Sequence, residues 1–234
     1  MSFARTLIAL SFCACTTTGS PLSHISPQVE VRSNPGGVAG VDYFTLSMTT
    51  WVDLDVLGDA VTAGSITATV DGAELAIDQA ATGYRGGRDS YVATFALAAP
   101  KSASPHPASS QISISDGETT WSVEIAALFV NDLAAAAPMT AGENTFVWPS
   151  AASPSAYSTI DWACIDVAGQ SSACGGAESD QQAVGVSQQF ITANVDGAPG
   201  TTVSITAERG ADAVSSDDGP TFLVRIDDLL ETTL

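Results

Sequence analysis

Basic residues are scarce in this chain. Its 234 residues include seven Lys and Arg residues, of which Lys101 is the single lysine, against 26 Asp and Glu residues. The formal net charge of −19 at pH 7 repels nucleic-acid phosphates, so nucleic acid is excluded as an expected partner. The acidic residues are dispersed along the chain, a pattern that is typical of a solvated surface.

Histidine is scarce too, and the common catalytic motifs are absent. The two histidines are His24, in a Thr/Ser/Pro-rich stretch, and His106, between two prolines. No Gly-x-Ser-x-Gly, His-Glu-x-x-His or phosphate-binding glycine loop occurs. We therefore predict a non-enzymatic protein and assign no catalytic residue. One alternative stays open, because a glycosidase needs only two suitably spaced carboxylates, and any of the 26 acids could supply them.

No apolar run reaches the ~18 residues of a membrane-spanning helix. A shorter run lies near the start of the chain, where Arg5 precedes apolar residues 7–10 and Phe12, and the run ends in Cys13-Ala14-Cys15. This order of a positive charge, an apolar segment and small residues predicts a secretory signal peptide. The body of the mature protein is then expected to be soluble.

The same segment, residues 1–15, resembles a bacterial lipoprotein signal, in which a Cys that follows a small residue receives the lipid. The resemblance implies a signal peptide over residues 1–14 and lipidation of Cys15, so that the membrane is a partner through an N-terminal lipid anchor. Thr16 follows Cys15, which in this family implies the outer membrane of a Gram-negative cell. Lipidation of Cys13, or an ordinary signal peptide that releases a soluble secreted protein, remain the alternatives.

The other two cysteines, Cys164 and Cys174, are expected to form a disulfide, because an exported protein works in an oxidising compartment. Closing so short a loop contributes roughly 2–3 kcal/mol in the loop-entropy model. A metal pair is the functional alternative, but no His lies near either Cys and no second Cys pair completes a site.

Beyond the Thr/Ser/Pro-rich residues 16–27, short β-type runs alternate with turns, and no sustained helical period is evident. This pattern predicts an all-β fold. The runs over residues 91–97, 112–121 and 144–149 resemble those of bacterial immunoglobulin-like or fibronectin type III-like β-sandwich domains. Trp121 and Trp148 are expected in the core, and Trp162 against the disulfide.

A break with four alanines, Pro138 and Gly142 divides the β-type runs into two groups. We therefore predict two tandem immunoglobulin-like β-sandwich domains after a flexible N-terminal tether. The predicted parts are the tether (15–27), domain 1 (28–131), a linker (132–141) and domain 2 (142–234).

Two hairpins are predicted from Asp-Gly turns. The turn at Asp71-Gly72 pairs Val70 with Ala73, and it also pairs Ala68 with Leu75 and Ile66 with Ile77. The turn at Asp116-Gly117 sets Ile114 opposite Thr119 and Ile112 opposite Trp121.

Trp51 is the best candidate for ligand contact, together with Tyr43. Trp51 lies on the face of its strand opposite to Phe44, Leu46 and Met48, so a regular strand exposes it, whereas a bulge at residues 49–50 returns it to the core.

Asp53, Asp55 and Asp59 are weak candidates for a Ca²⁺ site, since hard cations favour clustered carboxylates. They do not match the regular calcium-loop pattern, and a solvated acidic face is the better interpretation. No other cofactor is expected.

These observations together predict a non-enzymatic cell-envelope lipoprotein that acts in adhesion, surface assembly or ligand binding. Its expected partners are an envelope protein or a polysaccharide. A carbohydrate-binding module that uses Trp51 and a carbohydrate-active enzyme of the envelope are the alternatives.

Overall fold

The computed structural model describes residues 20–33, 41–100, 109–126, 133–148, 160–168, 170–176, 184–186, 190–214 and 219–234. Strands dominate these residues, so the prediction of a β-rich chain is confirmed. Besides a short 3-10 helix, η1 (Pro21–His24), the described segments contain one α-helix, α1 (Leu54–Thr62). No described helix is long and apolar enough to cross a membrane.

Helix α1 was not predicted, because the apolar residues around its start alternate as they do in a strand. Val52 and Leu54 continue the alternation of the preceding strand in the sequence, but the strand ends at Thr50. From Leu54 on, the side chains that the helix buries include Leu57 and Val61, which lie four residues apart on one helical face.

The described strands form three sheets. Sheet A has the order β13-β12-β16-β17-β1-β2-β7-β5, and β6 also pairs with β7. Its strands are β1 (Gln28–Ser33), β2 (Val41–Thr50), β5 (Ala76–Ile77), β6 (Gly83–Arg85), β7 (Ser90–Pro100), β12 (Trp162–Val167), β13 (Gln170–Gly176), β16 (Thr202–Val214) and β17 (Thr221–Thr233).

Two smaller sheets complete the layers. Sheet B has the order β4-β3-β8-β9 and sheet C the order β10-β11-β15-β14. The strands of sheet B are β3 (Thr67–Val70), β4 (Ala73–Glu74), β8 (Ser109–Ser115) and β9 (Thr120–Ala126). Those of sheet C are β10 (Ala134–Ala135), β11 (Gly142–Val147), β14 (Val184–Val186) and β15 (Phe190–Val195).

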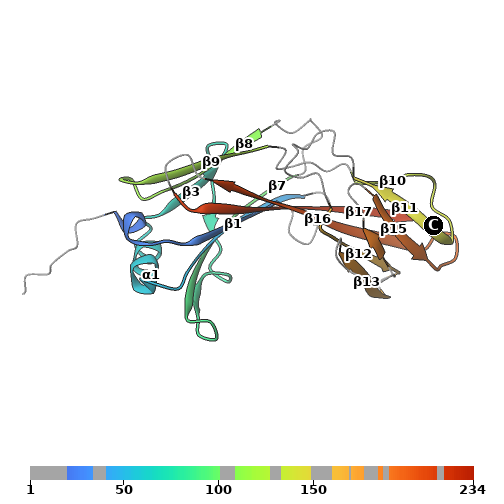
Figure 1. The fold of residues 1–234 in the computed structure, drawn as a ribbon, viewed down its shortest axis with the longest axis horizontal. Coiled ribbons are helices and arrows are strands. Elements are labelled where there is room, and N and C mark those ends of the chain that lie inside the picture. The colour runs from blue at the N-terminus through green and yellow to red at the C-terminus, as the bar shows by residue number, and fades with distance from the viewer. Residues whose placement is uncertain are drawn as a thin grey trace, which may run out of the picture.

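The long hairpin of β16 and β17 connects the two ends of the molecule. Its register runs without interruption from Thr202 opposite Thr233 to Val214 opposite Thr221. The first half of β16 pairs with β12, whereas the first half of β17 pairs with β1, parallel to it. Sheet A is therefore continuous along the molecule, as the orange and red strands of Figure 1 show.

Sheets B and C cover the same face of sheet A. On β16 the buried side chains include Ile205 and Arg209, and on β17 they include Val224 and Ile226. Arg209 lies opposite Ile226, and side chains that lie opposite each other share a face. The face that packs under sheet B at one end thus continues under sheet C at the other (Figure 1).

This hairpin bears on the predicted division of the chain. Residues 222–226, from predicted domain 2, pair with β1 of predicted domain 1, and β10 lies within the predicted linker 132–141. The division itself stays a prediction. The pairing shows that a cut at residues 132–141 would remove a strand from the first group.

The described residues of the predicted tether, which begin at Ser20, pack on the body. Leu22 is 1% exposed and Ile25 is buried. The Leu22 amide donates to Asp116 Oδ2 (2.9 Å), and the Ser20 hydroxyl donates to the same oxygen. The signal peptide, Cys13, Cys15 and the tether residues before Ser20 lie outside the described residues.

The first predicted hairpin is confirmed next to its turn. Val70 pairs with Ala73, and Asp71 and Gly72 have φ angles of 49° and 79°, as this two-residue turn requires. The pair of Ile66 with Ile77 does not form. After Leu75 the chain leaves sheet B, and Ile77 pairs with Phe95 of β7 in sheet A.

The second hairpin has the predicted face but the wrong register. Ile114 pairs with Trp121, not with Thr119, because the turn holds four residues. Oδ1 of Asp116 accepts the amides of Glu118 (3.0 Å) and Thr119 (2.8 Å), which stabilises the longer turn. A two-residue shift leaves each side chain on its face, so Trp121 is buried as expected.

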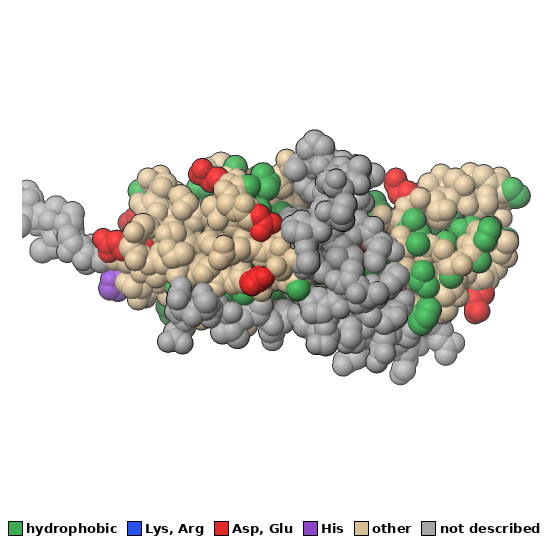
Figure 2. Space-filling view, turned by 90° about the horizontal axis from the view of Figure 1, so that it is seen from above, with side chains coloured by type: hydrophobic (Ala, Val, Ile, Leu, Met, Phe, Trp, Pro, Cys, Tyr) green, Lys and Arg blue, Asp and Glu red, His purple; other side chains and the backbone are tan. Residues whose placement is uncertain are grey.

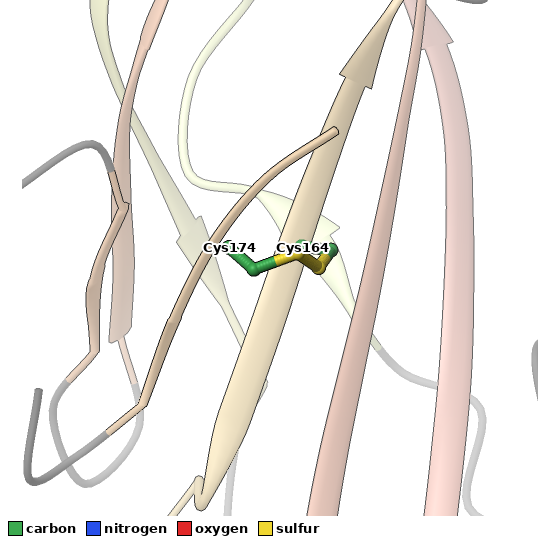
Figure 3. Close-up of a disulfide and its surroundings, with 2 residues drawn as sticks. All are labelled: Cys164 and Cys174. Atoms are coloured by element: carbon green, nitrogen blue, oxygen red, sulfur yellow. A yellow bond between two sulfur atoms is a disulfide. The ribbon is translucent and has the colours of Figure 1, made fainter. Parts of the chain in front are cut away.

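The predicted disulfide is present. Cys164 on β12 lies directly opposite Cys174 on β13, and the sulfur atoms are bonded (Figure 3). Ala163 and Ile165 are buried under sheet C, so the alternation of β12 places Cys164 on the outer face. Trp162 shares this outer face and is 40% exposed.

Candidate functional site

An open groove of about 620 Å³ lies where β2 ends and the hairpin of β6 and β7 begins. In Figure 1 this green hairpin extends beside α1. The groove contains two exposed aromatic rings and two arginines. Its lining residues are Thr49, Trp51, Tyr84, Arg85, Gly86, Gly87, Arg88, Ser90 and Val92.

Trp51 reaches the groove because β2 is regular. Its pairing with β7 shows no register shift as far as Thr50, so no bulge turns Trp51 toward the core. Thr50 is fully buried, and its hydroxyl donates to the Val52 carbonyl (2.6 Å) where the chain leaves the strand. Trp51 is 49% exposed, so the alternative with a bulge is wrong.

Tyr84 is the second ring, and α1 holds it in place. Its hydroxyl donates to Asp55 Oδ1 (2.8 Å), and its ring packs edge-on against Tyr91 at 4.9 Å between centroids. Gly58 of α1 permits this approach, because a Cβ there would lie 3.1 Å from the Tyr84 oxygen. The hydrogen bond to Asp55, with a smaller contribution from burial, raises the pKa of Tyr84. An exposed ring is thereby held in one orientation.

Arg85 and Arg88 supply positive charge at the groove. Neither forms a salt bridge within the part of the chain that the structure describes. Arg85 Nη2 donates to the carbonyl of Ala81 (2.5 Å). The lining itself contains no carboxylate. In a chain of net charge −19, this is a local excess of positive charge.

The structure does not bring Tyr43 to Trp51. Tyr43 lies near the other end of β2, opposite Ala98, and is half-buried. Eight residues of extended strand separate it from Trp51, which is about 26 Å at ~3.3 Å per residue. The two aromatic side chains therefore cannot contact one small ligand together.

The three calcium candidates lie around the start of α1. Asp53 precedes the helix with a φ of 50°, Asp55 accepts the Tyr84 hydroxyl, and Asp59 is exposed. No group of three or more His, Cys, Asp or Glu residues that could hold a metal ion occurs among the described residues. Asp55 accepts a hydrogen bond that fixes the orientation of the Tyr84 ring in the groove.

A second charged cluster lies on sheet A where β1, β16 and β17 meet. Arg32 Nη2 lies 2.7 Å from Glu208 and 3.1 Å from Asp227. Arg225 pairs with Glu30 (3.2 Å) and also with Glu208. Burial acts to lower the pKa of Arg225, but Glu208 and Glu30 outweigh it and raise it. Each arginine is compensated, so this cluster stabilises the sheet.

Asp161 borders this cluster, beside the half-exposed Trp162. Burial raises the pKa of Asp161, and the negative charge of Glu208 adds to the effect. The amide of Asp161 donates to the Glu208 carbonyl (2.9 Å), which continues the β12–β16 ladder. The backbone of Asp161 thus extends the pairing of β12 with β16 by one hydrogen bond.

Acidic side chains dominate the charged surface elsewhere. On the face shown in Figure 2 they are scattered over both ends of the molecule, and no Lys or Arg among the described residues appears there. Comparison with models of known protein families and with curated protein sequences found no match to this chain.

Tyr84, Arg85 and Arg88 were not recognised from the sequence. One signal was available, because two of the seven basic residues lie within four positions, on either side of Gly86-Gly87. Their relation to Trp51 was not readable, since it depends on the pairing of β2 with β7, about forty residues apart in sequence.

Proposed function

We propose that this protein is a non-enzymatic cell-envelope lipoprotein that binds a polysaccharide in the groove at Trp51. In this proposal the lipid is attached to Cys15 and lies in the outer membrane, and the body consists of two tandem immunoglobulin-like β-sandwich domains. Adhesion or surface assembly is the biological result of such binding.

One observation carries the binding function, namely two exposed aromatic rings that line one groove. Trp51 is 49% and Tyr84 57% exposed, in a groove of about 620 Å³. Large exposed aromatic side chains mark interaction sites, and a volume of about 300–1,000 Å³ is usual for ligand pockets. Sugar rings present apolar C–H faces that pack on flat aromatic rings, and their hydroxyls suit a polar neighbour such as Thr49, which lines the groove and is partly exposed.

The second ring has the rigidity that binding requires. Tyr84 is held by Asp55 and Tyr91, so little side-chain entropy is lost when a ligand packs on it. An enzyme is not favoured, since no carboxylate lines the groove.

Polysaccharide binding is tested by affinity electrophoresis of the full chain against neutral and acidic polysaccharides. We expect wild type to be retarded by at least one of them and Trp51→Ala to migrate freely. Trp162→Ala is the matched control, because it removes an exposed tryptophan outside the groove. Equal retardation of wild type and Trp51→Ala would exclude the groove as the binding site.

The lipid anchor is tested separately by labelling with a lipid precursor in bacterial cells. We expect label in the wild type and none in Cys15→Ser. Unchanged labelling of Cys15→Ser would move the anchor to Cys13, and an unlabelled wild type would favour a secreted soluble protein.

A further inference from the structure

We infer that the polysaccharide bound in the groove is acidic and that its carboxylates pair with Arg85 and Arg88. This inference rests on the proposed function and adds the chemical class of the ligand.

The charge distribution carries the inference. The described residues include five arginines, and Arg32 and Arg225 both pair with carboxylates. Arg209 is 1% exposed and stacks on Trp148 at 4.5 Å, inside the molecule. Arg85 and Arg88 are the exposed pair, and within the described residues no carboxylate lies within salt-bridge distance of either.

The absence of partners is notable in so acidic a chain. Asp89 follows Arg88 directly, and Asp55 and Asp59 lie nearby on α1. Asp55 accepts the Tyr84 hydroxyl, and neither Asp89 nor Asp59 reaches an arginine to form a salt bridge. Two cations that form no salt bridge with the described acidic residues are available to an external anion.

The backbone turn brings the two arginines together. The Arg88 amide donates to the Arg85 carbonyl (2.9 Å), so residues 85–88 form a turn whose ends lie within about 7 Å. Between them, a Cβ at Gly86 or Gly87 would meet no atom within 4 Å, so the surface between the arginines is open. One chain of linked uronic acids can thus approach both guanidinium groups.

Guanidinium and carboxylate match in geometry as well as in charge. The planar guanidinium donates two parallel hydrogen bonds to one carboxylate, which gives strength and orientation. Trp51 and Tyr84 supply the apolar ring contacts on the same groove. The repulsion of an acidic ligand by the rest of the surface is short-ranged at physiological salt, since charges are screened beyond about 8 Å.

The test compares polygalacturonate and alginate with their esterified forms, which keep the backbone and remove the charge. Binding of the full chain is measured by titration calorimetry and affinity electrophoresis. We expect wild type to bind an acidic form at least about tenfold more tightly than its ester, and this preference to shrink as salt rises.

Variants assign the preference to the two arginines. Arg85→Gln with Arg88→Gln should bind acid and ester equally, whereas Arg85→Lys with Arg88→Lys should keep part of the preference. Thr202→Glu with Asn194→Asp is the control for net charge, because it lowers the net charge by two units, as the Gln variant does, at exposed positions on β16 and β15 outside the groove. It should bind as wild type does. Equal melting temperatures confirm that each variant folds.

The outcomes separate the two proposals. Equal binding of acid and ester by wild type, or an unchanged preference in the Gln variant, overturns the acidic ligand but leaves the groove in place. Tighter binding of a sulfated polysaccharide than of any uronate overturns the carboxylate assignment. If Trp51→Ala binds every form as wild type does, or if wild type binds none, the proposed function fails as well.

Discussion

Removing the Cys164–Cys174 disulfide should destabilise the whole molecule by an amount that the loop length sets. The two cysteines are ten residues apart in sequence. A cross-link of this length lowers the entropy of the unfolded chain, which stabilises the folded state by about 2.5–3 kcal/mol at 25 °C. For a protein of this size, each kcal/mol shifts the melting temperature by about 2–4 °C. The variant Cys164→Ala with Cys174→Ala should therefore melt roughly 5–12 °C lower.

The fold also predicts that the whole molecule unfolds in a single thermal transition. The disulfide joins β12 to β13 at the edge of sheet A, and β12 pairs with β16. Because β16 and β17 run through both ends of the sheet, loss of the sheet C end exposes the interior of the sheet B end. Thermal unfolding followed by circular dichroism should then show a single transition that moves as a unit.

The assay compares oxidised wild type, reduced wild type and the double variant. The last two should melt together, because the same cross-link is missing. Coincident melting of all three would refute the loop argument, and it would mean that the β12–β13 hairpin persists in the unfolded chain. Two separate transitions, of which one alone shifts, would refute the coupling through β16 and β17.

Three further substitutions test particular contacts. Gly175→Ala should lower stability by about 1–3 kcal/mol in urea unfolding, since its Cβ would overlap the Val184 carbonyl oxygen, whereas Gly176→Ala places its Cβ 3.3 Å from the Asp161 carbonyl oxygen and should lower stability less. Asp116→Asn should cost about 1–2 kcal/mol at pH 7, because the amide that replaces Oδ2 cannot accept the Leu22 N–H. Burial acts to raise the pKa of Asp116 but its hydrogen bonds outweigh it and lower the pKa, so the stabilisation is present above the ordinary value of 3.8 and is lost as pH falls below it. Melting temperatures of wild type and Asp116→Asn should therefore converge toward pH 3, and a constant difference would contradict this sign. Gly58→Ala should displace Tyr84, since the new Cβ would lie 3.1 Å from its oxygen, and the tyrosinate titration at 295 nm should then show a lower pKa for that residue.

Local signals in the sequence predicted the faces of both hairpins, whereas long-range pairing and side-chain hydrogen bonds to the backbone explain where the predicted registers differ from the structure. The Asp71-Gly72 turn determined its nearest pairs, since both residues have the positive φ angles that the turn needs. Ile77 does not pair within the predicted hairpin, because it pairs instead with Phe95 of β7 in the larger sheet. The turn at Asp116 has four residues and not the predicted two, because the Asp116 carboxylate accepts hydrogen bonds from backbone amides. An Asp-Gly pattern alone does not reveal these bonds.

Of the two aromatic residues in the candidate site, the sequence predicted one, Trp51, and not the other, Tyr84. The face of Trp51 followed from the alternation of β2, which is a local property. The partner ring was not visible, because the position of Tyr84 depends on an unexpected helix and on a glycine within it. Tyr43 does not line the groove with Trp51, since it lies near the far end of β2, eight residues before Trp51.

The scarcity of basic residues adds a second reason, beside the two exposed aromatic rings, to assign function to the groove. A buried carboxylate has to be compensated, and Arg32 and Arg225 pair with the largely buried Glu208 and Asp227 in this way, whereas Arg209 is itself buried and stacks on Trp148. Their presence is explained by the structure itself. Arg85 and Arg88 have no such explanation, because they are exposed and form no salt bridge within the described residues. They lie beside two exposed aromatic rings, and recognition of an anionic ligand accounts for all four side chains together.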